Sequence, residues 1–257
     1  MQHSGGAVRF LASVASESEA LICSSLGADI IDAKNPAAGA LGALPLATVR
    51  AIRAAVPAGL PVSATVGDPQ DDADAVARAV VEMAGTGVDI VKIGFRVGAA
   101  SHDVVQRLAT LQLDGARLVA VLLAEDGVDL ELVASLARAG FAGVLLDTGD
   151  KRLGALPDRV GRETLSGFVA AAHENALFAG LAGSLAAAHV PYLLSFNPDV
   201  LGFRGGLCRA GERVSQIDAD AVHRVRAAVP ACNGSAIDTC REPRDNAIAR
   251  FATESAV

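Results

Sequence analysis

The chain predicts a (β/α)8 barrel, in which eight parallel strands alternate with helices. Eight short apolar runs recur along the sequence, and their starts lie 21 to 35 residues apart, the length of one strand–helix unit. Hydrophobic residues make up 51% of the 257 residues, enough for a large core, and α/β barrels of about 250 residues are common. Aromatic residues are only 4%, so we expect an aliphatic core.

The predicted strands are near-continuous apolar runs, as expected when helices cover one face of a parallel sheet and a packed interior covers the other. An open doubly wound sheet is the structural alternative. It usually needs fewer units, and no G-x-G-x-x-G follows the first run. In chain order the strands are Val8–Val14, Asp29–Lys34, Pro61–Val66, Asp89–Gly94, Leu118–Leu123, Gly143–Thr148, Phe178–Ala182 and Val200–Arg204.

Helix signals fill the segments between these runs. Ser16 is followed three residues later by Glu19, as in a capping box. Acidic residues open the third segment, where they complement the helix dipole. The predicted helices are Ser16–Leu26, Leu46–Ala55, Asp71–Ala84, Asp103–Leu111, Leu130–Ala139, Arg162–Asn175 and Ile217–Val229, with a short helix over Leu185–Leu194 broken near Pro191.

We expect one catalytic barrel domain over residues 1–230 and a C-terminal extension over residues 231–257. The four cysteines form no C-x-x-C pair, and no histidine pair has ligand spacing, so free thiols and no metal site are expected. The net charge of −7, without a basic stripe or an aromatic platform, predicts no nucleic-acid partner. Alanine-rich helix faces suggest a homo-oligomer.

The sequence also predicts a cytoplasmic protein with no membrane partner. Its N-terminus lacks the apolar stretch of a signal peptide. The charge-free stretch 176–197 contains glycines, a histidine and a proline, whereas a membrane span is a more uniformly apolar helix of about 20 residues.

Lysine is unusually rare in this chain. Only Lys34, Lys92 and Lys151 occur among 22 basic residues, and each follows an apolar, strand-like run. Arginine does not lose its proton in proteins, so lysine is needed where a free amine must react. The three lysines are therefore candidates for chemistry, although leftover surface cations are the plain alternative.

Two aspartates accompany these lysines at predicted strand ends. Asp32 and Lys34 share one face of the second strand by the period-two rule, and Lys92 sits late in the fourth. Asp147 ends the sixth strand, and Lys151 follows in its loop. Barrel enzymes build their sites at this end of the strands. We expect all five side chains to converge there.

Such a cluster has a chemical consequence. Ammonium groups gathered in a desolvated site lower a lysine's pKa, and the freed amine can attack a carbonyl to form a Schiff base. Neighbouring carboxylates then transfer protons. Purely structural pairing of the aspartates with the lysines is the alternative, because ion-pair networks also perturb pKa values.

Small residues at other strand ends predict where a ligand binds. Ser63 and Thr65 share a face at the end of the third strand and leave room above the core. Gly183 and Ser184 follow the seventh strand, where we expect them to open a helix, and Arg204, Gly205 and Gly206 follow the eighth. Barrels commonly bind phosphate on these last two loops, where glycine permits close backbone approach and arginine adds charge. Arg96 is a weaker candidate for a second phosphate site.

Six segments, in order, resemble the (5-formylfuran-3-yl)methyl phosphate synthases, also called 4-(hydroxymethyl)-2-furancarboxaldehyde-phosphate synthases. The likeness runs from about residue 8 to 229, and D-x-K-N-P-x-x-G-x-L-G-A is its most specific part. The segments are GADIIDAKNPAAGALGA (27–43), SATVGD (63–68), IVKIG (90–94), LLDTGDK (145–151), LAGSL (181–185) and GFRGG (202–206).

The resemblance implies a Schiff-base barrel lyase that needs no metal or organic cofactor. Such enzymes condense two molecules of glyceraldehyde 3-phosphate to a phosphorylated furan aldehyde, a precursor of methanofuran-type one-carbon carriers. The family's Schiff-base lysine falls on Lys34 and its companion aspartate on Asp32. The second lysine falls on Lys92, and the Asp-x-x-x-Lys pair on Asp147 and Lys151. The extension has no counterpart in the family pattern.

Two other functions stay open at this point. Sugar-phosphate decarboxylases and aldolases of the orotidine-phosphate or hexulose-phosphate kind also use an Asp-x-Lys near a strand end, without an imine. A non-catalytic sensor of phosphate ligands on a barrel scaffold would bind without turnover.

Overall fold

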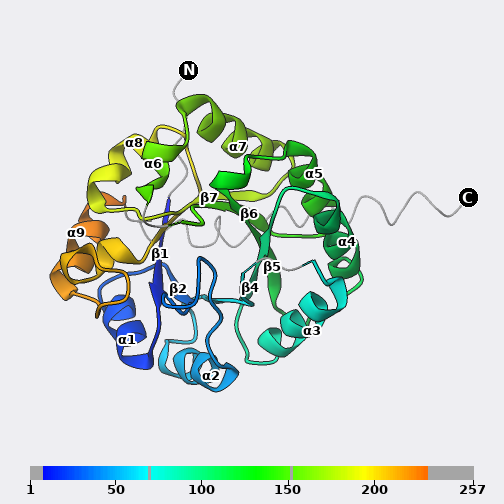
Figure 1. The fold of residues 1–257 in the computed structure, drawn as a ribbon. Helices are drawn as coiled ribbons and strands as arrows, with labels where there is room; N and C mark the ends of the chain where they lie inside the picture. The colour runs from blue at the N-terminus through cyan, green and yellow to red at the C-terminus, as the bar shows by residue number, and fades with distance from the viewer. Residues whose placement is uncertain (1–7, 69–70, 151–152, 231–257) are drawn as a thin grey trace, which may run out of the picture.

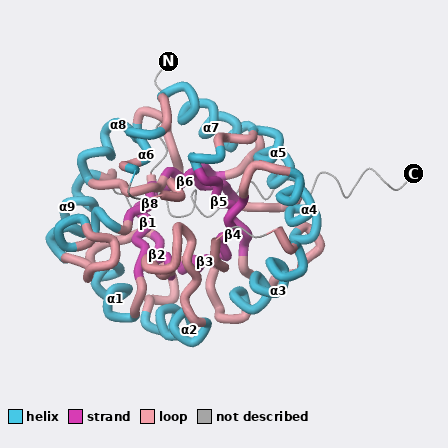
Figure 2. The backbone as a smooth tube through the Cα atoms, viewed as in Figure 1, coloured by secondary structure: helices cyan, strands magenta, loops and turns pink. Residues whose placement is uncertain are grey.

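Eight parallel strands close into a barrel surrounded by helices (Figures 1 and 2), which confirms the predicted (β/α)8 fold. The computed structural model describes residues 8–68, 71–150 and 153–230. Lys151 and the predicted extension 231–257 lie outside the described residues. Each strand pairs with the next in sequence, and the first pairs with the last. No helix in these ranges is both long enough and apolar enough to cross a membrane.

All eight predicted strands are confirmed, each end within one residue of its predicted position. Side chains alternate between the barrel interior and the helical layer, which is why apolar residues occupy nearly every strand position. The strands are β1 (Arg9–Val14), β2 (Ile30–Ala33), β3 (Val62–Thr65), β4 (Ile90–Phe95), β5 (Arg117–Leu123), β6 (Gly143–Asp147), β7 (Phe178–Leu181) and β8 (Val200–Phe203).

The helices follow the prediction with three differences. Helix α4 begins four residues earlier than expected, after Gly98, and α6 was not predicted. Pro191 lies in the first turn of α8, where proline is tolerated, instead of breaking a helix. The helices are α1 (Glu17–Ser25), α2 (Leu46–Ala55), α3 (Ala73–Ala84), α4 (Ala99–Leu108), α5 (Leu130–Arg138), α6 (Leu156–Arg159), α7 (Arg162–Glu174), α8 (Val190–Leu194) and α9 (Ala219–Ala228).

The capping box at α1 forms only in part. The Ser16 hydroxyl accepts a hydrogen bond from the Glu19 N–H, as predicted. The Glu19 carboxylate, however, accepts from the Ala15 N–H and binds Arg204. An ion pair with a distant residue has therefore displaced one half of the local motif.

The core has two layers. Most buried apolar side chains lie between the strands and the helices, where Phe10 and Phe203 meet edge to face. A smaller group, which includes Ile90, Val121 and Leu145, fills the barrel interior. This packed interior closes the bottom of any space at the carboxyl ends of the strands.

Three aspartates hold the amino end of the barrel. Asp29, Asp89 and Asp199 each directly precede a strand. Each donates its own N–H to a carbonyl on the preceding strand, and its carboxylate accepts from the N–H of that same residue. The strand partners are Phe10, Val62 and Ala179.

Each of these carboxylates also bonds a cationic or imidazole side chain. Arg226 and Arg53 lie 2.8 Å from Asp29 and Asp89, and His173 Nε2 lies 2.8 Å from Asp199. The repeated device fixes the register of the paired strands and leaves the opposite end of the barrel to build the site.

Candidate active site

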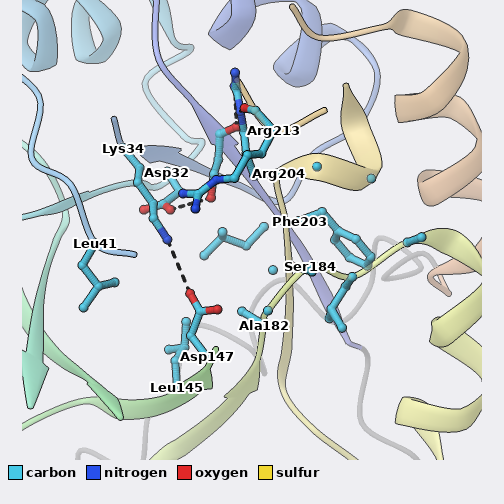
Figure 3. A pocket seen from close by; sticks show the side chains of 18 of the residues that line it. Asp32, Lys34, Leu41, Leu145, Asp147, Ala182, Ser184, Phe203, Arg204 and Arg213 are labelled. Carbon is cyan, nitrogen blue, oxygen red and sulfur yellow. Dashed lines mark hydrogen bonds and ion pairs between the residues drawn. The ribbon is translucent and has the colours of Figure 1, made fainter. Parts of the chain in front are cut away.

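A cavity of about 460 Å³ opens at the carboxyl ends of the strands. Asp32, Lys34, Lys92 and Asp147 all line it, and they come from β2, β4, β6 and the residue after β2. Figure 3 shows Lys34 directed across this space toward Asp147. The structure thus brings together the four described members of the predicted cluster.

Asp32 and Lys92 form the deeper of two ion pairs. Lys92 Nζ lies 2.7 Å from Asp32 Oδ1, and the side chains are 4% and 0% exposed. Ser63 Oγ donates to the same carboxylate at 2.7 Å, and Ser13 Oγ donates at 2.8 Å. A buried ion pair is stable only when its remaining lone pairs also accept hydrogen bonds. The two serine hydroxyls supply these bonds to Asp32.

The pKa values of both members of this pair are lowered, for different reasons. Burial alone would raise the pKa of Asp32, but the charges of Lys92 and Lys34 and the hydrogen bonds from Lys92 and Ser63 outweigh it. Burial lowers the pKa of Lys92; Asp32 partly opposes this, and the nearby charge of Lys34 adds to it. Asp32 is therefore a firmly ionised carboxylate.

Lys34 and Asp147 form a looser pair nearer the opening. Lys34 Nζ lies 3.4 Å from Asp147 Oδ2, near the limit of a hydrogen bond. The other oxygen of Asp147 accepts from the Thr148 N–H at 2.8 Å. Contact at this distance holds the Lys34 amine less tightly than Asp32 holds Lys92, so Lys34 is the amine better placed to meet a ligand.

The loop after β2 forms one wall of the cavity. Leu41 is buried on this wall, and its N–H donates to Asp68 Oδ1 at 2.8 Å. A Cβ on Gly42 would lie 2.3 Å from the Ala38 carbonyl oxygen, and one on Gly39 would overlap Asp68. The glycines of the most specific sequence motif are therefore required by the compactness of this loop.

Ser63 and Thr65, which we expected at the substrate, stand behind the cavity wall. Both are almost fully buried, and neither lines the cavity that the described residues form. Ser63 donates to Asp32, and Thr65 Oγ1 donates to the Gly42 carbonyl at 3.0 Å. Their hydroxyls support the site residue and the loop instead of facing the open space.

The glycine-rich loops after β7 and β8 lie at the cavity, as their position in the sequence predicts. Gly183, Ser184, Gly205 and Gly206 all line it. A Cβ on Gly206 would lie 2.3 Å from the Leu185 carbonyl oxygen, so the two loops touch through their backbones. Ser184 has φ of 50° and belongs to the loop, whereas we had expected Gly183 and Ser184 to open a helix.

Comparison with models of known protein families gives a match over most of the chain. The family model described as 4-HFC-P synthase matches residues 10–226. The chain belongs to the 4-HFC-P synthase family.

The relatives agree with this family. A protein named putative (5-formylfuran-3-yl)methyl phosphate synthase, from Methylorubrum extorquens, is 44% identical over 85% of this chain and 92% of its own. The (5-formylfuran-3-yl)methyl phosphate synthase of Methanocaldococcus jannaschii is 34% identical over 78% and 90%. A solved 3-hexulose-6-phosphate synthase superposes with a TM-score of 0.57 over 87% of this chain and all of its own; at 19% identity it shows the fold alone.

Arg204 of this 4-HFC-P synthase family member lines the cavity, as the sequence predicts, but its N–H groups do not serve the phosphate contact that we expected. It uses all five of its N–H groups on protein oxygens. Two bonds go to the Glu19 carboxylate, and the others reach the carbonyls of Ser13, Arg213 and Ser215. Arg204 therefore ties the loop after β8 to β1 and α1, with no donor left for a phosphate.

Two residues that we did not predict also shape the site. Glu125, after β5, accepts from the N–H groups of Gly149 and Asp150 at 2.7 and 3.3 Å, and so fixes the start of the loop after β6. Arg213 lines the cavity from the loop after β8. Arg96, the weaker candidate for a second phosphate site, is exposed and does not line the cavity formed by the described residues.

Proposed function

We propose that this protein condenses two glyceraldehyde 3-phosphate molecules to (5-formylfuran-3-yl)methyl phosphate through a Schiff base on Lys34. The observation that carries the proposal is the meeting of two lysine–aspartate pairs in one cavity, one tight and one loose. The names of the relatives support the product. The product would be a precursor of methanofuran-type carriers.

Lys34 is the proposed nucleophile. Its amine attacks the carbonyl carbon of one triose phosphate, and the carbonyl oxygen leaves as water to give the imine. The imine withdraws electrons, so the adjacent C–H loses a proton more readily. The resulting enamine carbon attacks the aldehyde of the second molecule. A hydroxyl oxygen of the adduct then adds to the imine carbon and closes the ring, which releases the Lys34 amine, and loss of a second water and of inorganic phosphate completes the furan.

Asp147 is the better placed of the two carboxylates to transfer protons. One of its oxygens already lies 3.4 Å from the Lys34 nitrogen, at the cavity. Asp32 accepts bonds from Lys92, Ser63 and Ser13, and these stabilise its ionised form. Asp32 then holds the Lys92 ammonium in position to stabilise oxyanions that develop during the reaction.

The glycine-rich loops after β7 and β8 are proposed to hold one substrate phosphate, because both line the cavity and barrels commonly bind phosphate on these two loops. Lys151, by the resemblance, would assist the phosphate that departs.

Borohydride trapping tests the proposal. The protein is incubated with glyceraldehyde 3-phosphate, reduced with borohydride and digested, and mass spectrometry locates the adduct. We expect it on Lys34, with a conjugated furan aldehyde appearing in the ultraviolet spectrum when reduction is omitted. An adduct on Lys92 would contradict the assignment of roles.

The same assay separates the other two functions. A decarboxylase or aldolase of the hexulose-phosphate kind would act on its own sugar phosphate and survive borohydride treatment. A phosphate sensor would bind the triose phosphate without forming product, and would tolerate exchange of its lysines for arginine.

A further inference from the structure

Two arginines of the loop after β8 differ in how many protein partners they have. Within the described residues, the guanidinium of Arg213 makes one hydrogen bond, from Nη2 to the Gly39 carbonyl oxygen at 3.2 Å. Arg204 uses all five of its donors. Most N–H groups of Arg213 therefore remain available at the cavity that its side chain lines.

The guanidinium of Arg213 is itself suited to binding an anion. Burial lowers the pKa of its guanidinium; Asp147 and Asp68 oppose this, and Arg204 adds to it. An arginine nevertheless keeps its charge in proteins. A partly desolvated guanidinium with open donors pairs well with a phosphate, whose oxygens match its planar fork. Glu212 also lines the cavity, but it is exposed, so salt and water screen its repulsion.

The side chain of Arg213 points away from the glycines of its own loop. Gly205 and Gly206 open the loop after β8, and Gly206 lies beside the loop after β7, whereas the Arg213 guanidinium reaches Gly39 in the loop after β2. Strand β1 lies between β8 and β2 in the barrel. Arg213 thus spans the edge of the cavity over β1, and its bond to Gly39 holds the two loops together on either side.

We propose that Arg213 binds the phosphate of the second triose phosphate, at a subsite separate from the glycine-rich loops. This rests on the proposed function, because a reaction of two phosphorylated molecules needs two phosphate subsites in one cavity. The Lys34 imine holds the first molecule, whose phosphate lies on the glycine-rich loops. Arg213 makes and breaks no covalent bond.

Calorimetry with inorganic phosphate tests the subsite without any turnover. We expect two binding events in the unaltered protein. Arg213→Gln should keep one and weaken the other roughly 10- to 100-fold, as expected for loss of a charge-assisted hydrogen-bonded pair. Arg213→Lys should recover part of the affinity, because it keeps the charge but not the planar fork. The matched control is Arg209→Gln, an exposed arginine of the same loop.

Two results would overturn the subsite. If Arg213→Gln bound phosphate with the same curve as the unaltered protein, the guanidinium would hold no phosphate. Loss of every binding event would show that there is only one phosphate position. Both results are readable even if the protein makes no furan aldehyde, so they are distinct from failure of the proposed function.

A second measurement assigns the subsite to one of the two molecules. In Arg213→Gln, borohydride trapping of glyceraldehyde 3-phosphate on Lys34 should keep its concentration dependence, while formation of the furan aldehyde should require about tenfold or more substrate. An equal loss of trapping and product would overturn the assignment to the second molecule. Should the Gln variant fail to fold, Arg213→Lys provides the same pair of measurements.

Discussion

Aspartates beside cationic side chains occur at both ends of the barrel, but the two ends use them differently. At the amino end the carboxylates of Asp29, Asp89 and Asp199 are 26%, 49% and 46% exposed and accept strand N–H groups. At the carboxyl end Asp32 and Asp147 are 0% and 6% exposed and face lysines. Exposed pairs are worth little, whereas buried pairs carry a large desolvation cost. The amino end sets strand register; the carboxyl end concentrates charge in a cavity.

The two ends of the barrel also differ in the cation that their aspartates use, mostly arginine at the amino end and lysine at the carboxyl end. Arg53 and Arg226, at the amino end, each bond several backbone carbonyls as well as an aspartate. Arginine can make all of these bonds at once because its planar guanidinium carries five N–H donors. The two described lysines occupy the cavity, where an amine that can lose its proton is useful.

The largest expected effect is on catalysis at the carboxyl end. Lys34→Arg should keep the charge next to Asp147 but lose the imine, because a guanidinium does not act as the nucleophile. We expect furan aldehyde formation to fall at least about 10³-fold. Ultraviolet absorption measures the product, and thermal unfolding checks that the variant is folded. Activity within about tenfold of the unaltered protein would exclude covalent catalysis at this residue.

The next effect is on stability and distinguishes a buried pair from an exposed one. Lys92→Met leaves the Asp32 carboxylate buried without its cation, which should lower the free energy of unfolding by about 3–5 kcal/mol. Adding Asp32→Asn should restore part of it, because the uncompensated charge is gone. Urea unfolding of the single and double variants measures both. A double variant less stable than Lys92→Met alone would contradict this account.

The pH dependence of stability should carry the signature of the same pair. The pKa of Asp32 is lowered on folding, so its contribution is complete above the ordinary value of about 3.9 and is lost as the pH falls through the lower folded value. The pKa of Lys92 is also lowered, so the unfolded chain again binds the extra proton.

The Lys92 contribution should therefore rise with pH toward about 10.4, the ordinary pKa of lysine. Urea unfolding across the pH range, compared with the Asp32→Asn/Lys92→Met double variant, isolates both contributions. The difference between the two proteins should increase with pH in both windows. A difference that decreases with pH in the acid window would be inconsistent with a lowered pKa for Asp32.

The smallest effect belongs to the amino end. Asp89→Asn weakens the bonds to the Val62 N–H and Arg53, and should lower the free energy of unfolding by only about 0.5–1.5 kcal/mol. Catalysis should not change, since the site is at the other end of the barrel. Asp29→Asn is the matched variant, because Asp29 bonds the Phe10 N–H of β1 and Arg226 in the same way. If Asp89→Asn or Asp29→Asn lost activity while its stability stayed the same, the amino end of the barrel would not be a purely structural region.

Much of the site was predictable because strand periodicity decides which side chains point inward. The alternation of Asp32, Ala33 and Lys34 places the charged pair inside once the strand is recognised. Lys92 and Asp147 follow from the rule that barrel sites form at the carboxyl ends of strands. The same rule located the glycine-rich loops.

The loops were less predictable, because a loop side chain takes its direction from partners that are distant in sequence. The sequence favours Arg204 as the phosphate cation, yet Glu19, far away along the chain, and three backbone carbonyls accept all of its hydrogen bonds. Ser63 and Thr65 lie at the end of the predicted strand, but their hydroxyls donate to Asp32 and to the Gly42 carbonyl instead of facing the cavity. The aspartates before β2, β4 and β8 did leave a local signal: each stands immediately before the first strand residue, an isoleucine or valine.

The sequence by itself determined the number of strands, their inward faces and the few amines available for chemistry, because these depend on spacing and composition along the chain. Only the tertiary structure decided which lysine is held tightly, which is held loosely, and which arginine still has donors to offer. Those properties are set by distances between side chains from different strands and loops, and no spacing along one segment encodes them.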